Sequence, residues 1–166
     1  MKALKLSVAV AVLLIGLGVT SSVYGHCEIP CGIYGDQMRF DMWEEQITTV
    51  EKSINEIVRL SKEATPNYNQ IVRWVENKDK HADDIREIAT QYFLAQRVKP
   101  TDASDQKAYA QYLKKLEVLH KIIVHAMQAK QTTDLDHVTQ MRALAKEFHE
   151  LYFGPAEKAH LEEHKK

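Results

Sequence analysis

The sequence predicts an all-α protein: an antiparallel (up-down-up-down) four-helix bundle that follows an apolar leader and a short segment with both cysteines. Three observations predict this class. Apolar residues recur at steps of three and four along most of the chain, polar segments with capping residues interrupt the pattern, and no stretch alternates apolar and polar residues as a strand would. The 166 residues are 45% hydrophobic and 27% charged, which fits one folded domain.

The first two predicted helices span residues 37–61 and the segment from Thr65-Pro66 to about Gln96. The apolar stripe of the first helix keeps heptad-like spacing at Phe40, Trp43, Ile47, Val50, Ile54 and Ile57. Thr65-Pro66 is a capping residue followed by a proline suited to a first helical turn. The stripe of the second helix includes Ile71, Trp74, Val75, Ala82, Ile85, Ile88, Ala89 and Tyr92. Polar residues 76–80 interrupt that stripe.

The third and fourth predicted helices complete the bundle, residues 37–155. Residues 101–105 form a polar start for the third helix, and residues 132–134 open the fourth. Their apolar stripes are Tyr109, Leu113, Leu116, Leu119, Ile123, Ala126 and Met127, then Leu135, Val138, Met141, Leu144, Ala145, Phe148 and Leu151. Gly154-Pro155 is a stop signal. A charged tail, residues 156–166, follows.

Residues 1–25 have the three parts of a secretory signal peptide: a basic start, an apolar run and a small-residue end. Val23 and Gly25 fit the small-residue rule for a cut before His26, so we expect signal peptidase to remove this leader. The product would be periplasmic or secreted. The alternatives are an uncleaved membrane anchor, for which the apolar run is short, and a cut after Ser22.

Charge excludes one class of partner. The chain has a formal net charge of −1, and the leader carries two lysines and no acidic residue, so its removal gives −3. Without a basic excess, we expect no nucleic acid partner.

Both cysteines lie in residues 26–34, HCEIPCGIY, directly behind the leader. A cut before His26 exposes its α-amine, which titrates near pH ~7.7 to 8.0 and can bind a metal when it loses its proton. The amine, the His26 imidazole, the Cys27 backbone nitrogen and the thiolates of Cys27 and Cys31 then form one donor set. Neighbouring backbone donors form flat chelate rings, so this nitrogen and sulfur set favours square-planar Ni(II) or Cu(II) over tetrahedral zinc. Residues 26–36 are therefore the predicted N-terminal metal-binding hook.

The cysteines also have a simpler interpretation. Two cysteines in an exported protein usually form a disulfide. A Cys27–Cys31 bridge would close a very small loop and therefore stabilise little. A non-catalytic helical bundle with this bridge, and a nickel or copper carrier without turnover, are the two rivals to an enzyme.

The segment HCEIPCGIY resembles the nickel hook of nickel-containing superoxide dismutases, whose mature chains begin His-Cys-x-x-Pro-Cys-Gly-x-Tyr. The resemblance implies a four-helix bundle, assembly as a homohexamer and one nickel ion per subunit. The implied reaction is the conversion of superoxide to dioxygen and hydrogen peroxide, with nickel alternating between Ni(II) and Ni(III).

The resemblance also implies roles for individual residues. His26 would supply amine and axial imidazole, Cys27 amidate and thiolate, and Cys31 the second thiolate. Tyr34, and Tyr92 in the QYF segment, match the two active-site tyrosines. Asp41 takes the place of the carboxylate that orients the axial histidine, and Arg73 is the candidate for its arginine partner. Two positions depart from the pattern: Glu28 stands where aspartate is common, and Leu94 where some members have lysine.

Other groups of potential ligands carry weaker signals. His160 and His164 lie one helical turn apart, but Leu161 occupies the position that a zinc-protease motif gives to glutamate. Glu117 and His120 form a single Glu-x-x-His, whereas a di-iron bundle needs two. The remaining histidines follow no ligand spacing: His81, His125, His137 and His149.

Overall fold

The computed structural model describes residues 36–163, with side chains described as far as Gly154. Within this range the protein has four helices and no strands, which confirms the predicted all-α class. The elements are α2 (Asp36–Ser61), α3 (Tyr68–Glu87) with its direct continuation η1 (Ile88–Arg97), α4 (Gln106–Gln131) and α5 (Asp136–Glu163). The predicted leader and hook lie outside the described residues.

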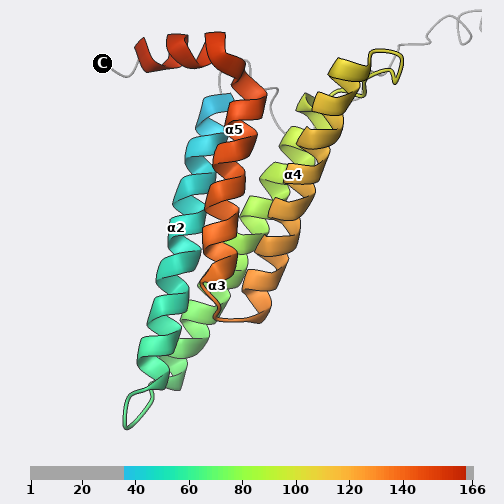
Figure 1. Cartoon of the computed structure of the whole chain (residues 1–166). Helices are drawn as coiled ribbons and strands as arrows, with labels where there is room; N and C mark the ends of the chain where they lie inside the picture. The colour runs from blue at the N-terminus through green and yellow to red at the C-terminus, as the bar shows by residue number, and fades with distance from the viewer. Residues whose placement is uncertain (1–35, 164–166) are drawn as a thin grey trace, which may run out of the picture.

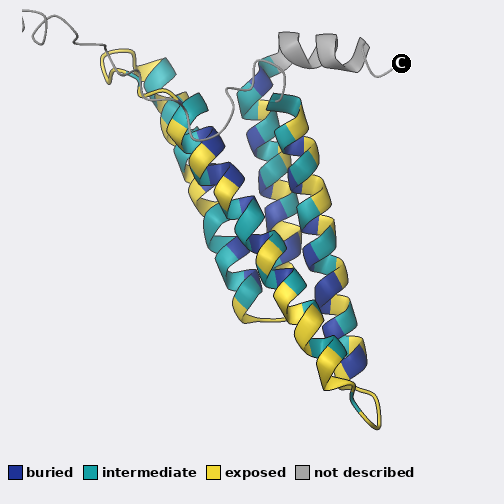
Figure 2. Ribbon diagram, turned by 180° about the vertical axis from the view of Figure 1, so that it is seen from behind, coloured by how far each residue is buried: buried dark blue, intermediate teal, exposed yellow. Residues whose placement is uncertain are grey.

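Each long helix packs against two others. α2 contacts α3 and α5, and α4 contacts the same two helices. Figure 1 shows α2 beside α5, with the α2–α3 loop at the lower end of the molecule and the connection from η1 to α4 at the upper end. Buried residues lie on the faces that the helices turn toward one another, as Figure 2 shows in dark blue. One core therefore runs along the described helices.

The stripe predicted for the first helix is confirmed, because all six of its apolar residues are buried in α2. Trp43 is fully buried, and its indole nitrogen donates a hydrogen bond of 3.1 Å to the backbone oxygen of Ile85 in α3. Around it, the rings of Phe40, Phe93 and Phe148 pack with centroids 4.9 to 5.9 Å apart from their neighbours. These rings bring α2, η1 and α5 into one aromatic cluster.

The polar segment at residues 76–80, which interrupts the predicted apolar stripe, contains one buried residue. Lys78 is only 3% exposed. Its ammonium group donates to the backbone oxygens of Ala129, at 2.7 Å, and Lys130, at 2.5 Å, in the last turn of α4. These carbonyls lie at the negative end of the helix dipole, so they provide partners for a buried cation. Lys78 therefore ties α3 to α4.

The predicted starts of the helices hold to within three residues, but one cap differs. α3 is capped by Asn67, whose side-chain oxygen accepts from the backbone nitrogen of Gln70 at 3.2 Å, so Thr65 was the wrong choice. Pro66 lies just outside the helix. α4 is capped by Asp105, whose carboxylate accepts from the backbone nitrogen of Ala108 at 3.0 Å.

Two predicted core positions in the later helices were wrong. Leu113 and Leu135 are exposed, at 46% and 38%. In α4 the buried apolar residues include Val118 and Ile122, which the predicted stripe omitted. Both sets of residues have helical spacing, so periodicity alone did not identify the inward face of this helix.

Gly154 interrupts α5, at the predicted stop signal. Its φ of 66° lies in the left-handed region, which glycine adopts without steric cost. Helical backbone resumes beyond it and ends at Glu163, so part of the predicted tail is helical. In Figure 1 the ribbon turns away from the bundle at this point. Among the described residues, no helix is both long enough and apolar enough to cross a membrane.

Replacing Trp43 tests the aromatic core. Trp43→Ala should lower the free energy of unfolding by about 3–5 kcal/mol, because it removes a fully buried ring and leaves a cavity. Met38→Ala is the matched control in the same helix, since Met38 is 50% exposed, and should change stability by less than about 0.5 kcal/mol. Urea denaturation followed by circular dichroism measures both. Equal effects of the two substitutions would contradict the assigned core.

Candidate functional site

The hook residues precede the first described helix. His26, Cys27, Glu28, Cys31 and Tyr34 all lie outside the described residues, so their roles stay predictions. Asp36 begins α2 two positions after Tyr34. The first turn of α2 is therefore the part of the described chain that is nearest in sequence to the hook.

Asp36 is the centre of a polar cluster at this end of the bundle. Its Oδ1 accepts a hydrogen bond from the hydroxyl of Tyr92, and its Oδ2 accepts from Nη2 of Arg97. Oδ2 also accepts from the hydroxyl of Tyr152 at 2.7 Å, and Nε of Arg97 donates to that hydroxyl at 3.2 Å. We call Asp36, Tyr92, Arg97 and Tyr152 the Asp36 cluster. It joins α2, η1 and α5.

The π-helical backbone of η1 explains how two of its residues reach the same carboxylate. In an α-helix, at 3.6 residues per turn, residues five positions apart differ by about 140° around the axis. In a π-helix the backbone hydrogen bond spans five residues, as between the nitrogen of Val98 and the oxygen of Phe93 at 2.8 Å, so residues five positions apart are neighbours on one side, as residues four apart are in an α-helix. Tyr92 and Arg97 are five positions apart and therefore share one side of η1.

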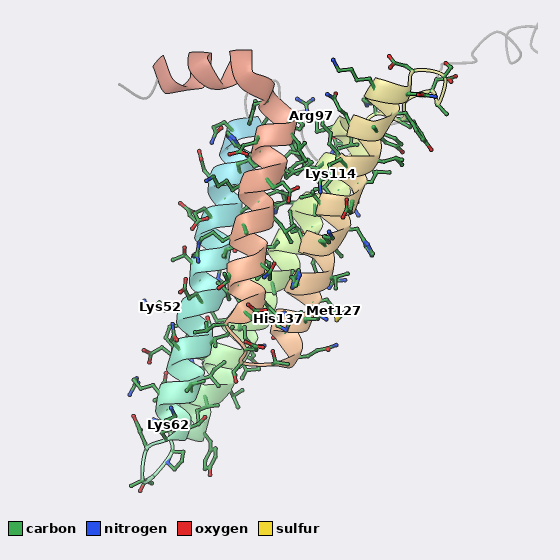
Figure 3. The ribbon with its side chains drawn as sticks, in the orientation of Figure 1. Lys52, Lys62, Arg97, Lys114, Met127 and His137 are labelled. Carbon is green, nitrogen blue, oxygen red and sulfur yellow. The ribbon has the colours of Figure 1, made fainter. Side chains whose placement is uncertain are left out.

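The cluster lies against the aromatic core. Tyr92 and Phe93 are fully buried, and their rings meet edge to face with centroids 5.2 Å apart. Tyr152 also contacts Phe93, at 5.5 Å between centroids. The rings of η1 and α5 thus hold both hydroxyl donors of Asp36 in place. Figure 3 shows Arg97 at the upper end of the bundle.

The hydrogen bonds of the cluster shift the pKa values of its members. Burial alone would raise the pKa of Asp36, but the bonds from Arg97, Tyr92 and Tyr152 outweigh it and hold the pKa below its usual value. Burial, and then the hydrogen bond to Asp36, raise the pKa of Tyr92 to about 12. The same two causes raise the pKa of Tyr152. At neutral pH the cluster therefore holds one carboxylate, one guanidinium and two neutral phenols.

A second arginine lies beside the cluster. The guanidinium carbon of Arg39 is 4.9 Å from the ring centroid of Tyr92, and that of Arg97 is 5.8 Å from it. The hydrogen bond described for Arg39 goes to the sulfur of Met42 at 3.4 Å, and its buried Nε has no partner in the described part of the chain. Within residues 36–154 no carboxylate pairs with it. The Arg39 charge is thus not neutralised by a described acidic group.

The other two predicted residues of this site lie apart from the cluster. Asp41 is exposed on α2 and accepts a hydrogen bond of 2.8 Å from the side chain of Gln37. Arg73 is exposed on α3, nineteen residues before Tyr92, which is about 28 Å along a continuous helix. The described structure brings neither residue to Tyr92. Their roles beside the axial histidine stay predictions, because His26 lies outside the described residues.

Sequence reasoning missed Asp36, Arg97 and Tyr152. An acidic residue at a helix start and a basic residue at a helix end have an ordinary explanation in the helix dipole, so neither attracts attention alone. Their pairing depends on the π-helix, which the apolar pattern did not predict. Among the described residues no group of three or more histidine, cysteine, aspartate or glutamate side chains could hold a metal ion. The thiolate and nitrogen donors of residues 26–31 remain the set whose chemistry fits nickel.

Removing the charge of Asp36 tests the cluster. A carboxyl whose folded pKa lies below its unfolded value of ~3.9 stabilises the fold above that pH, and this contribution disappears as the pH falls through the folded pKa. Asp36→Asn should therefore lower the free energy of unfolding at pH 7 by about 1–3 kcal/mol. It should also reduce the further loss that the native chain suffers below pH ~4.

Asp41→Asn is the matched control for this substitution. It removes an exposed carboxylate from the same helix and should change stability at pH 7 by less than about 0.5 kcal/mol. Denaturant titrations at pH 7 and pH 3 compare the three proteins. If both variants unfold like the native chain at pH 7, Asp36 does not hold the three elements together.

Known proteins identify the family of this chain. The family model for nickel-containing superoxide dismutase matches residues 21–155, most of the chain and the whole of the predicted hook. Comparisons with curated proteins and with solved structures return no significant match. The matched span includes every residue of the Asp36 cluster. The chain belongs to the family of nickel-containing superoxide dismutases and is an oxidoreductase that acts on superoxide.

Proposed function

We propose that this enzyme holds one nickel ion per chain at the mature N-terminus, with His26, Cys27 and Cys31 as its ligands. The observation that carries the proposal is the position of the hook: its sequence leads directly into the first turn of α2, where Asp36 is fixed by side chains of η1 and α5. A short segment needs such an anchor if its donors are to keep one arrangement. Family membership supports nickel as the metal.

The bound nickel would supply the redox chemistry by alternating between Ni(II) and Ni(III), which thiolate and amidate donors favour. The α-amine of His26 becomes available when the preceding peptide bond is cut, and it loses its proton near pH ~7.7 to 8.0 without a metal. The Cys27 and Cys31 thiolates would lie beside the peroxide product, so access to them would have to be limited to avoid oxidation. Tyr34 and Tyr92 are the candidate residues for that limited access.

Tyr92 fits a role in orientation better than one in proton supply. Two superoxide ions and two protons give one dioxygen and one hydrogen peroxide, so each cycle consumes two protons. A pKa of about 12 keeps the phenolic proton of Tyr92 in place at neutral pH. That proton is directed at Asp36, and the hydroxyl oxygen can still accept a hydrogen bond from water. Water is therefore the proposed source of the protons, and Tyr92 orders it.

The charge around Tyr92 suits an anionic substrate. Arg39 and Arg97 carry two positive charges and Asp36 one negative charge, so this group of side chains has a net charge of +1. The N-terminus of α2 adds the positive end of a helix dipole. Because Leu94 stands where some relatives have lysine, we propose that Arg39 supplies the local attraction for superoxide. Glu28, Asp41 and Arg73 are proposed to support the ligands without contacting substrate.

The leader and the assembly belong to the same proposal. Signal peptidase would remove residues 1–25, expose His26 and release the enzyme into the periplasm or the medium; the basic, apolar and small-residue order of the leader supports this. We propose an antiparallel bundle that assembles as a homohexamer. In support, an open groove of about 670 Å³ along α2 and α5 combines apolar side chains such as Phe40 and Ala143 with charged ones such as Glu44, Arg142 and Lys146, a surface that another copy could cover.

The free N-terminus is the first experiment. Protein that starts at His26 and is reconstituted with nickel should remove superoxide rapidly, whereas protein that retains Gly25 should not, since its α-amine lies one residue too far from Cys27. Pulse radiolysis measures the decay. Equal rates would contradict a role for the His26 amine. Bound nickel without superoxide loss in either protein would contradict hook catalysis and favour a metal carrier.

Ionic strength tests the role of Arg39. Arg39→Gln should lower kcat/KM by about tenfold at low salt, and the deficit should shrink as salt screens the field. Arg39→Lys should retain most of the rate because it keeps the charge. Arg59→Gln, which removes an exposed arginine from the last turn of α2, far from Asp36 and Tyr92, is the matched control and should leave the salt dependence unchanged. A salt-independent deficit in Arg39→Gln would argue against electrostatic attraction.

Tyr92→Phe separates orientation from proton supply. The variant should lose part of its kcat by the same factor across pH 6 to 9, because the native hydroxyl keeps its proton throughout that range. The measurement is superoxide decay at several pH values with equal nickel content in both proteins. A deficit that grows as the pH rises toward 9 would instead identify Tyr92 as a proton donor.

A further inference from the structure

Two histidines meet where α4 approaches α5, away from the Asp36 cluster. His125 lies in the last two turns of α4 and His137 in the first turn of α5. Their Nδ1 atoms are 3.2 Å apart, and both side chains are partly exposed. Figure 3 shows His137 near the lower connection between these helices, while Arg97 marks the opposite end of the bundle.

The two rings present their Nδ1 edges to each other. The ring centroids are 5.5 Å apart, 2.3 Å more than the nitrogens, so the nitrogens lie between the rings. Without a metal ion, the two nitrogens form a hydrogen bond only if one Nδ1 carries a proton and donates it to the other. If both rings place their proton on Nε2 instead, two lone pairs converge on one point.

The separation of the nitrogens fits coordination of a single metal ion. With metal–nitrogen bonds of about 2.05 Å, a tetrahedral site places two histidine nitrogens about 3.3 Å apart, and a right-angled pair about 2.9 Å apart. The observed 3.2 Å corresponds to an angle of about 100° at the metal. Because the nitrogens lie on the line between the ring centroids, an ion at this bond length would sit about 1.3 Å to one side of that line. Both rings would have to turn toward the ion, by about 40°, when it replaces the shared proton. Water would complete its coordination, because both side chains reach solvent.

The connection between the helices restricts the pair. Residues 132–135 join them, and the carboxylate of Asp134 accepts from the backbone nitrogen of Asp136 at 2.9 Å. The backbone nitrogen of Asp134 in turn donates to the hydroxyl of Thr132 at 3.3 Å. A hairpin with such a short, internally bonded loop limits how far the two residues can separate. Preorganised ligands lose less entropy when they bind.

The charges nearby also favour a cation at neutral pH. Burial, and then His137, lower the pKa of His125, so its lone pair is available to a metal rather than to a proton. The negative charge of Asp136 raises the pKa of His125 and would attract a cation. The positive charge of Lys121 lowers that pKa and would repel a cation. From the geometry we infer that His125 and His137 form a binding site for a divalent first-row transition metal, separate from the nickel hook. Imidazole ligands suit Zn(II), Cu(II) and Ni(II).

Zinc titration of the mature, nickel-loaded enzyme tests the site. Zn(II) is a suitable probe because it is redox-inactive and binds imidazole. Isothermal titration calorimetry should show about one equivalent bound per chain. His125→Gln and His137→Gln should each weaken binding by at least about tenfold. His120→Gln is the matched control, since it removes an exposed histidine from the same helix and should leave the affinity unchanged.

Two further measurements identify the binding residues directly. In ¹⁵N spectra of the histidine side chains, the Nδ1 resonances of His125 and His137 should shift together as Zn(II) is added. Zn(II) should also raise the Tm of the native chain and not that of His137→Gln, because the ion links α4 to α5. The Cys27→Ser/Cys31→Ser double variant should bind zinc at this site as the native chain does.

Three results would overturn the inference. One is native zinc affinity in His125→Gln, and another is an equal loss in His120→Gln. The third is zinc binding that disappears with the two cysteines, which would assign the ion to the hook. None of these results depends on superoxide turnover, so they test the zinc site independently of the proposed catalysis at the hook.

Discussion

The carboxylate of Asp36 is the interaction on which the rest of this end of the molecule depends. It accepts hydrogen bonds from η1 and α5 while it occupies the first turn of α2. Charge-assisted hydrogen bonds are stronger than neutral ones, and here several share one acceptor group. The position at which the hook joins the bundle is therefore fixed by three elements rather than by a single helix end.

The aromatic core makes that arrangement possible. A π-helix is rare, usually short and often found at functional sites, whereas η1 extends over ten residues. Tyr92 and Phe93 of η1 are fully buried among rings from α2 and α5. Burial of these rings offsets the cost of the unusual backbone, by about 2–3 kcal/mol for each large side chain. In return, the π-helix directs Tyr92 and Arg97 to one carboxylate.

The all-α class and the four helices were predictable from the sequence because local signals agree with packing. Phe40, Trp43 and Ile47 show both the spacing and the bulk of an inward helix face, and all are buried. Lys78 was not predictable, since its burial depends on carbonyls at the end of another helix. The hook motif was readable because its nine residues are consecutive, whereas the Asp36 cluster draws on positions 36, 92, 97 and 152, which no local pattern connects.

His125 and His137 illustrate the same limit and bear on metal selectivity. Twelve residues separate them, a spacing without meaning until the α4–α5 hairpin brings their rings together. Their imidazoles suit several divalent ions, whereas two thiolates and an amidate favour a metal that accepts a square-planar field and soft sulfur donors. The histidine pair also lies away from the Asp36 cluster, since Arg97 and His137 are at opposite ends of the bundle. Ligand type and geometry, rather than affinity alone, therefore distinguish the two sites. A zinc ion bound to the histidine pair need not compete with nickel for the hook.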